Sequence, residues 1–285
     1  MLSLSRFRML ILMATAILSN SYLGTIVTRM VNTNSMKGVC IPYLNCYSCP
    51  SALFSCPIGI MQHFMAIRAV PYMLIGFLGV VGLSVGRMAC GWLCPFGLVQ
   101  DLLYKIRSRK YLVPKNLKYL KYGILVVFVL LLPFFTGVSW FSLFCPAGKL
   151  TAGLPWMLWD PVDPVTGATI IPGPPGALFY FVTALLFVFL IWFVFSKRPF
   201  CVGFCPLGAI FALFNRISLV RLQVDINCDG CKTCNANCPM GLDVPVDVSG
   251  EECIRCMECT RCGHVKLVNP FEIGGLQRDE QRRTS

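Results

Sequence analysis

Two runs of closely spaced cysteines near the end of the chain could do chemistry, because thiolates at such spacings bind metals. The first run is Cys228, Cys231, Cys234 and Cys238, followed by Pro239, and the second run is Cys253, Cys256, Cys259 and Cys262. The C-x2-C-x2-C-x3-C-P spacing is typical of chains that hold two [4Fe–4S] clusters, in which three thiolates bind one cluster and the fourth binds the other. The second run departs from the pattern, because its last gap is one residue short and Gly263 stands where proline is usual.

These spacings predict how the eight thiols divide. We expect one [4Fe–4S] cluster on Cys238, Cys253, Cys256 and Cys259. We expect a second cluster on Cys228, Cys231 and Cys234, with Cys262 as its fourth ligand. Paired C-x2-C motifs also suit a tetrahedral zinc ion, which is the alternative. Eight cysteines in two runs of four favour iron–sulfur clusters.

Two further cysteine pairs precede the tail. Cys90 and Cys94 lie in the segment C-G-W-L-C-P-F-G, and Cys201 and Cys205 lie in the segment C-V-G-F-C-P-L-G. Proline directly after a cysteine suits the first turn of a new helix, whose free N–H groups would face an anionic cluster. Two cysteines cannot complete a [4Fe–4S] site, so we expect the pairs to share a third cluster. Buried thiols without a metal are the alternative, since a reducing compartment disfavours disulfides.

The remaining cysteines suggest a fourth site. Cys56 and Cys145 each begin another C-P-x-G element, so the chain contains this element four times. Such repetition is typical of inverted repeats in membrane proteins. We therefore expect an outer cluster on Cys46, Cys49, Cys56 and Cys145, with Cys40 left over or replacing one of these ligands. Disulfides are the alternative, because the outer side of a membrane is oxidising.

The elements that position these cysteines are predicted to lie in a membrane. Hydrophobic residues make up 56% of the 285 residues and charged residues only 13%. A bilayer core needs about 20 apolar residues in a helix, and segments 9–28, 69–86, 122–144 and 177–196 meet this length. The first segment could instead be a signal peptide. The predicted fold is an all-α membrane bundle of four transmembrane helices with a small C-terminal two-cluster ferredoxin-like α+β domain.

The basic residues predict the orientation. With the N-terminus inside, 21 of the 25 Lys and Arg residues fall on the inner side, which places both termini in the cytoplasm. We expect no nucleic-acid partner despite the net charge of +12, because anionic clusters offset part of it. We expect residues 1–219 to form the transmembrane domain, 220–272 a cytoplasmic domain with two clusters, and 273–285 a disordered basic tail.

The chain offers few other groups for catalysis. It has no C-x-x-C-H motif for covalent haem, and its two histidines, His63 and His264, fall on opposite sides of the predicted membrane. We therefore expect no haem. His63 is interpreted as a polar residue at the membrane interface, with a hydrogen bond to a quinone as the alternative. No nucleophile–base pair stands out, so we expect no catalytic residue.

The paired C-x3-C-P motifs at Cys90/Cys94 and Cys201/Cys205, followed by the tail runs, resemble the NapH, NosR and CcoG type of membrane polyferredoxins. The resemblance implies a multi-pass protein of the prokaryotic cytoplasmic membrane and the electron-transfer part of a quinol dehydrogenase. It implies relay of electrons between quinone or a cytoplasmic donor and a partner at or across the membrane. The partners implied are lipid, quinone, and iron–sulfur, flavin or cytochrome subunits. An accessory reductase in metalloenzyme maturation and a structural assembly subunit are the alternatives.

Overall fold

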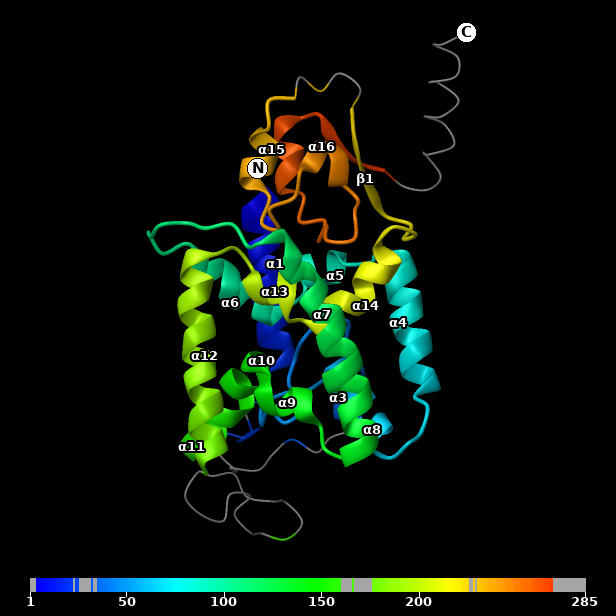
Figure 1. The fold of residues 1–285 in the computed structure, drawn as a ribbon, viewed down its shortest axis with the longest axis vertical. Helices are drawn as coiled ribbons and strands as arrows, with labels where there is room; N and C mark the ends of the chain where they lie inside the picture. Colours follow the sequence, from blue (N-terminus) through cyan, green and yellow to red (C-terminus); the bar gives the residue numbers. More distant parts are fainter. Residues whose placement is uncertain are drawn as a thin grey trace.

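The computed structural model describes residues 4–22, 24–25, 32, 35–159, 166, 176–225, 228 and 230–268 (Figure 1). A body of helices carries, at one end, the tail with the two cysteine runs. The elements of the body are α1 (Leu4–Ser19), η1 (Ser35–Gly38), α3 (Pro57–Ala66), α4 (Tyr72–Ser84), α5 (Met88–Trp92), α6 (Pro95–Tyr104), η2 (Lys115–Tyr119), α7 (Leu120–Ile124), η3 (Leu125–Leu131), α8 (Leu132–Thr136), α9 (Trp140–Phe144), α10 (Pro146–Gly148), η4 (Lys149–Gly153), α11 (Leu154–Trp159), α12 (Ala177–Phe195), α13 (Pro199–Gly203) and α14 (Pro206–Asn215). The basic tail predicted at 273–285 lies outside the described residues.

Two helical stretches of the described chain are long and apolar enough to cross a membrane. They are Asn116–Thr136, which runs from η2 through α8, and Ala177–Phe195, which is α12; they contain 21 and 19 residues. At 1.5 Å per residue each reaches about 30 Å, the thickness of a bilayer core. Seven residues of the first stretch form a π-helix, η3, which directly precedes the turn that contains Pro133. Because proline has no N–H to donate, the regular i→i−4 hydrogen bonding of the helix is interrupted at this point.

The prediction of four transmembrane helices is wrong. In the segment predicted at 69–86, α4 has only 13 residues, or roughly 20 Å. Pro71 precedes this helix, and Gly86 beyond its end has a φ of +55°, so the backbone breaks where the composition stays apolar. Helix α1 (Leu4–Ser19) begins before the segment predicted at 9–28 and ends at Ser19, so it covers only the first part of that segment. Composition alone does not reveal these breaks.

The tail also differs from the α+β domain that was predicted. Its described elements are β1 (Arg221–Val224), α15 (Thr233–Asn237), α16 (Val244–Asp247), η5 (Glu258–Cys262) and β2 (Val265–Val268). The two strands pair antiparallel, with Arg221 opposite Val268 and Val224 opposite Val265. Most of the tail is loop between the cysteines, because ligands at three-residue spacing leave little room for regular structure. This region therefore has few strands.

The segment that was predicted to be an outer loop is folded into the body. Tyr43, Leu44, Asn45 and Cys56 are all buried. The Tyr43 hydroxyl lies 2.6 Å from the hydroxyl of Ser19, and the Asn45 amide donates to the carbonyl of Phe54 at 3.3 Å. Such bonds satisfy polar groups that would otherwise be costly to bury. An irregular backbone can therefore lie inside the helical body.

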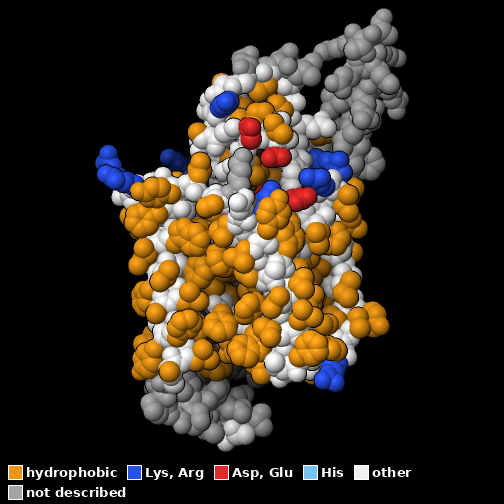
Figure 2. All heavy atoms as spheres, viewed as in Figure 1, with side chains coloured by type: hydrophobic (Ala, Val, Ile, Leu, Met, Phe, Trp, Pro, Cys, Tyr) orange, Lys and Arg blue, Asp and Glu red, His pale blue; other side chains and the backbone are white. Residues whose placement is uncertain are grey.

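Apolar side chains are exposed around the body. Figure 2 shows hydrophobic atoms over most of one face of the body, with charged side chains gathered where the tail begins. The exposed residues come from α1, α4, the η3–α8 stretch and α12; they include Leu10, Ile17, Met73, Val80, Val127, Phe135, Phe181, Val188 and Ile191. A contiguous apolar surface of this extent is typical of proteins that contact lipid or a large partner. We call this surface the apolar belt.

Candidate metal centres

Each C-P-x-G element begins a helix. Cys56, Cys94, Cys145 and Cys205 are the N-cap residues of α3, α6, α10 and α14, and the prolines that follow open the helices. The backbone N–H of Gly208 donates to Cys205 Sγ at 3.4 Å, whereas Cys56, Cys94 and Cys145 cap their helices without such a hydrogen bond to the sulfur. The predicted helix starts after Cys94 and Cys205 are thus confirmed. Free N–H groups at a helix start favour negative charge on the sulfur.

Two buried arginines cross between the pairs Cys90/Cys94 and Cys201/Cys205, which were predicted to lie on the inner side of the membrane and are called the inner cysteines. Arg87 and Arg198 each stand three residues before the first cysteine of a pair, yet each contacts the opposite pair. Arg198 Nη1 donates to the carbonyl of Cys90 at 3.0 Å, and Arg87 Nη2 donates to the carbonyl of Cys201 at 3.1 Å. The exposed fraction is 1% for Arg87 and 0% for Arg198. The two halves of the body therefore hold each other through a reciprocal contact that brings two positive charges to four cysteines.

The glycine of the C-P-x-G element makes room for these contacts. A Cβ on Gly97 would lie 3.2 Å from the guanidinium of Arg198, and one on Gly208 would lie 3.2 Å from Arg87. Both distances are tighter than ordinary van der Waals contact. The two arginines can approach the helix starts closely because these positions carry no side chain.

The inner cysteines lie together. Cys90, Cys94, Cys201 and Cys205 line one enclosed cavity, whose other lining residues are Tyr43, Leu44, Arg87, Leu207 and Gly208. Gln100 Nε2 donates to Cys201 Sγ at 3.2 Å. Arg87 Nε is buried and finds no acceptor within the described part of the chain. Four thiols and the unbonded Arg87 Nε–H suit a [4Fe–4S] cluster, whose irons bind thiolates and whose sulfides accept hydrogen bonds.

The structure brings three of the predicted outer ligands to one cavity. Cys46, Cys56 and Cys145 line it together with Leu44 and residues of α3, α9 and α10. Cys49 does not line it; its thiol lies 3.4 Å from the hydroxyl of Ser51, although it packs in the same small apolar cluster as Cys46. The thiol of Cys40 is 3.9 Å from the carbonyl of Ile41, in a different contact.

The inner and outer cavities are adjacent. Leu44 lines both of them. Burial raises the pKa of Cys145 to about 12, and negative charge on Cys56 and on Cys94 adds to the increase. Since Cys94 belongs to the inner set and Cys145 to the outer set, the two sets are within electrostatic reach of each other. The sequence had placed them at opposite faces of a membrane.

The tail thiols fall into two neighbouring groups. Burial raises the pKa of Cys259 to about 12, with further increases from Cys256, Cys253 and Cys238. Burial likewise raises the pKa of Cys234, with further increases from Cys262 and Cys231. Each group contains thiols that the spacing assigned to one cluster. Cys238 and Cys256 also pack in the same apolar core as Cys90, Cys94 and Cys205, so the tail continues directly into the body.

A buried ionic contact joins the tail to the body. Arg87 Nη1 lies 2.6 Å from Glu252 Oε2, and Lys121 pairs with the other oxygen of the same carboxylate. Trp92 Nε1 donates to the carbonyl of Arg255 at 2.9 Å, and a Cβ on Gly91 would lie only 2.4 Å from the carbonyl oxygen of Ile254. The tail is therefore packed tightly on α5.

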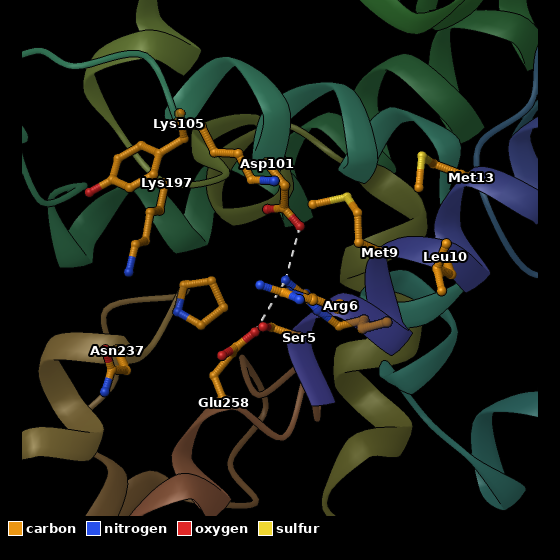
Figure 3. Close-up of a pocket in the computed structure, with 13 residues that line it drawn as sticks. Ser5, Arg6, Met9, Leu10, Met13, Asp101, Lys105, Lys197, Asn237 and Glu258 are labelled. Carbon is orange, nitrogen blue, oxygen red and sulfur yellow. Dashed lines mark ion pairs between the residues drawn. The ribbon is translucent and has the colours of Figure 1, made fainter. Parts of the chain in front are cut away.

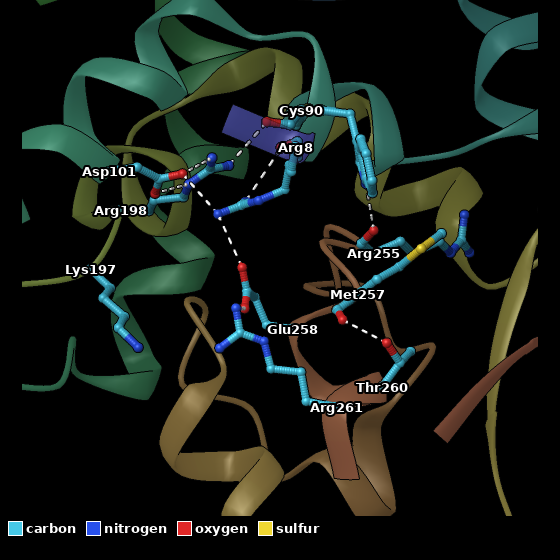
Figure 4. A network of polar contacts seen from close by, with 12 residues as sticks. Arg8, Cys90, Asp101, Lys197, Arg198, Arg255, Met257, Glu258, Thr260 and Arg261 are labelled. Atoms are coloured by element: carbon cyan, nitrogen blue, oxygen red, sulfur yellow. Dashed lines mark hydrogen bonds and ion pairs between the residues drawn. The ribbon is translucent and has the colours of Figure 1, made fainter. Parts of the chain in front are cut away.

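A second ionic network lies beside the first. Asp101 accepts from Arg198 at 2.7 Å and 2.8 Å, and Arg8 lies 3.2 Å from Asp101 and 3.7 Å from Glu258 (Figure 4). Burial alone would raise the pKa of Asp101, but Arg198 and Arg8 hold it below its usual value. The carboxylate therefore stays ionised and connects α1, α6 and the segment before α13.

The thiols are suited to metal. None of the 17 cysteines, all of which lie in the described part of the chain, forms a disulfide in the structure. Burial raises the pKa of Cys56 and Cys90 to about 12, so neither would ionise near neutral pH unless a metal replaced the proton. Among the described residues no three His, Cys, Asp or Glu side chains converge as a single-ion site requires.

His63 lies apart from the cysteine sites. It is exposed on α3, where its ring packs edge-on against Phe64 at 6.0 Å between centroids. The neighbouring Gln62 is buried instead and donates to the hydroxyl of Ser142 at 3.0 Å, which fixes α3 to α9. A quinone contact at His63 stays a prediction.

Sequence reasoning missed the residues that surround the cysteines. Arg87, Arg198 and Gln100 contact the inner set, and Glu252 and Asp101 hold the arginines. One signal could have identified the arginines, because the repeat is longer than was recognised and reads R-x2-C-x3-C-P-x-G in both copies. The carboxylates give no such signal, because they pair with arginines more than 90 residues away along the chain.

Comparisons with known proteins agree with this geometry. The chain matches the 4Fe-4S binding domain family over residues 69–114 and 178–224, which contain the two inner cysteine pairs. It is 29% identical to an uncharacterized protein of Methanocaldococcus jannaschii, over 72% of this chain and 81% of that protein. It is 28% identical to the ferredoxin-type protein NapH of Haemophilus influenzae, over 70% of this chain and 65% of that protein. No solved structure matches the chain.

A further relative is the methylamine utilization ferredoxin-type protein MauN of Paracoccus denitrificans, which is 28% identical over 59% of this chain and 50% of that protein. The chain thus spans about half to two thirds of the length of the NapH and MauN relatives. These similarities confirm the resemblance to NapH-type iron–sulfur proteins. Together with the two long apolar helices, they indicate that the protein associates with membranes.

Proposed function

Given that the chain is an iron–sulfur electron-transfer protein of the ferredoxin type, related to NapH and MauN, we propose that it relays electrons along four neighbouring cysteine sites. The relay starts in the tail and ends deep in the membrane-associated body. Bound [4Fe–4S] clusters supply one-electron redox couples at these sites. The protein supplies the ligands and sets the distances between the sites. It also encloses the sites among buried side chains, some of which are positively charged.

The proposed ligand sets follow the grouping of the thiols. The four sets, in order along the relay, are Cys228, Cys231, Cys234 and Cys262; Cys238, Cys253, Cys256 and Cys259; Cys90, Cys94, Cys201 and Cys205; and Cys46, Cys49, Cys56 and Cys145. Cys49 is proposed as the fourth outer ligand because it follows Cys46 at C-x2-C spacing and packs beside it. Residues 220–272 form the proposed two-cluster unit.

Leu44 lines both the inner and the outer cavity, and this shared wall is the main support for the proposal. Electrons cross a bilayer core of about 30 Å only in several shorter steps. Sites at opposite faces would have left one long gap. Sites that share a wall, and that continue through Cys238 and Cys256 into the tail, provide a path without such a gap.

We propose that the tail and the start of α1 lie on the cytoplasmic side. Ser5 and Arg6 line the same pocket as Asn237 and Glu258 of the tail, so the two ends lie together. The Lys and Arg surplus on this side agrees with the positive-inside rule. The tail would then exchange electrons with a cytoplasmic donor or quinone, and the outer site with a further iron–sulfur, flavin or cytochrome subunit.

The shared inner site can be tested by spectroscopy of the purified protein. Cys90→Ser and Cys201→Ser are expected to remove the same EPR signal, because each deletes one ligand of one cluster. Cys40→Ser is the matched control and is expected to leave that signal unchanged, since its thiol faces Ile41. Loss of two different signals from the first two variants would contradict the shared site.

A further inference from the structure

A pocket of about 510 Å³ lies where α1 and α6 meet the tail, separate from the inner and outer cysteine cavities (Figure 3). Its lining combines basic, apolar and tail residues. The lining includes Arg6, Leu10 and Met13 of α1, Lys105 directly after α6, Lys197 after α12 and Glu258 of the tail. The relay described above has no use for this pocket.

The pocket carries a surplus of positive charge. Its two carboxylates are already engaged, since Asp101 lies 2.7 Å from Arg198 and Glu258 lies 2.9 Å from Arg261. Arg6, Lys105 and Lys197 form no ion pair with any carboxylate in the described ranges. Three cations at one pocket attract an anion with more than one oxygen, such as a phosphate group.

One wall of the pocket is apolar and leads to the apolar belt. In Figure 3, Lys105 and Lys197 lie on one side of the view, and Met9, Leu10 and Met13 lie on the other. Leu10 and Met13 are exposed, as are Ile17 and Leu18 farther along the same helix. The apolar wall therefore continues down α1 on the surface that faces lipid under the proposed function.

We propose that this pocket binds one anionic phospholipid, with its phosphate among Arg6, Lys105 and Lys197 and its acyl chains along α1. The inference rests on the proposed membrane association. The surplus of positive charge favours an anionic lipid over phosphatidylcholine, whose phosphate is accompanied by a quaternary ammonium cation that the three cations would repel. Pro239 follows Cys238 and Glu258 precedes Cys259, so the bound lipid would also hold the tail against the body beside one cysteine site.

Native mass spectrometry of the cluster-loaded protein in detergent tests this proposal. The protein is titrated in turn with phosphatidylglycerol, phosphatidylcholine and inorganic phosphate. The test variant replaces the pocket cations, Arg6→Gln, Lys105→Gln and Lys197→Gln. The control variant removes the same charge from residues that do not line the pocket, Arg107→Gln, Arg109→Gln and Lys118→Gln.

The wild-type and control proteins are expected to retain one phosphatidylglycerol and no phosphatidylcholine. The test variant is expected to bind phosphatidylglycerol roughly 100-fold more weakly, since each basic contact is worth about a factor of five. Equal retention by test and control variants would overturn the proposal, and so would binding of inorganic phosphate as tight as that of the lipid. Iron and sulfide content, measured on the same samples, tests the proposed function separately, because loss of clusters leaves the lipid comparison readable.

Discussion

Arg87 donates a hydrogen bond from Nη2 to the backbone carbonyl of Cys201 across 3.1 Å, which joins one half of the body to the other at the inner cysteine site. Arg198 makes the reciprocal contact to Cys90. Because Arg87 also pairs with Glu252 of the tail, one buried guanidinium connects both halves of the body and the tail. Charge and geometry at this site therefore depend on the same side chain.

The reduction potential of the inner site is expected to depend on this charge. Reduction adds negative charge, so loss of a nearby buried cation makes reduction less favourable. Arg87→Gln should lower the potential by on the order of 50–100 mV, from a unit charge about 8 Å away at an effective dielectric constant of about 20. An EPR-monitored redox titration measures the shift. Arg216→Gln removes an exposed arginine that pairs with Glu251; a shift as large in this control would contradict a local effect.

Docking of the tail is expected to fail when Gly91 gains a side chain. Gly91→Ala would place Cβ 2.4 Å from the carbonyl oxygen of Ile254, so the tail must move away from α5. We expect faster proteolysis of the tail and weaker magnetic coupling between tail and inner clusters. Gly79→Ala in α4 is the control, since nothing lies within 4 Å of its Cβ position and alanine favours helix by up to about 1 kcal/mol. Equal protection of the tail in both variants would refute the packing argument.

The ionised state of Asp101 is expected to stabilise the protein in a pH-dependent way. Its pKa is held below the usual value by Arg198 and Arg8 against the opposing effect of burial. The stabilisation is therefore fully present above about pH 4, the unfolded value, and is lost as the pH falls through the lower folded value. Thermal unfolding in detergent should show no loss from this group between pH 8 and pH 5, and a decline below about pH 4.

Asp101→Asn should remove the same stabilisation and, with it, the decline below about pH 4. Loss of the carboxylate leaves the buried Arg198 without an ion-pair partner among the described residues and leaves Arg8 with only Glu258 at 3.7 Å, so we expect about 3–5 kcal/mol of destabilisation near neutral pH. Asp247→Asn changes an exposed carboxylate in the tail and should stay within about 0.5 kcal/mol. If both variants unfolded alike, the network around Asp101 would contribute nothing measurable.

Iron content is expected to report the outer site. Four clusters correspond to about 16 Fe and about 16 acid-labile sulfide per chain, and Cys145→Ser should remove about four of each. Cys40→Ser serves as the control and should remove none, because its thiol lies outside the outer cavity. Bound zinc, or an unchanged iron content in Cys145→Ser, would count against an outer cluster.

The sequence alone determined the chemistry of this protein. The spacing of Cys228, Cys231, Cys234 and Cys238 restricts which thiols can reach one cluster, because ligand spacing is a local property of the backbone. The same holds for Cys94 and Cys205, where the following proline forces a helix start and turns the free N–H groups toward the sulfur. Resemblance to NapH-type proteins followed from these local patterns.

Only the tertiary structure decided how the sites lie relative to one another. The apolar composition of segment 69–86 predicted a spanning helix, but Pro71 and Gly86 shorten it, and the segment around Leu44 folds into the body between two cysteine sets. Arg87 donates hydrogen bonds to Cys201 and Glu252, which lie more than 110 residues away along the chain. Local spacing carries no information about such contacts, because they depend on how separate helices pack and on which buried charges must meet.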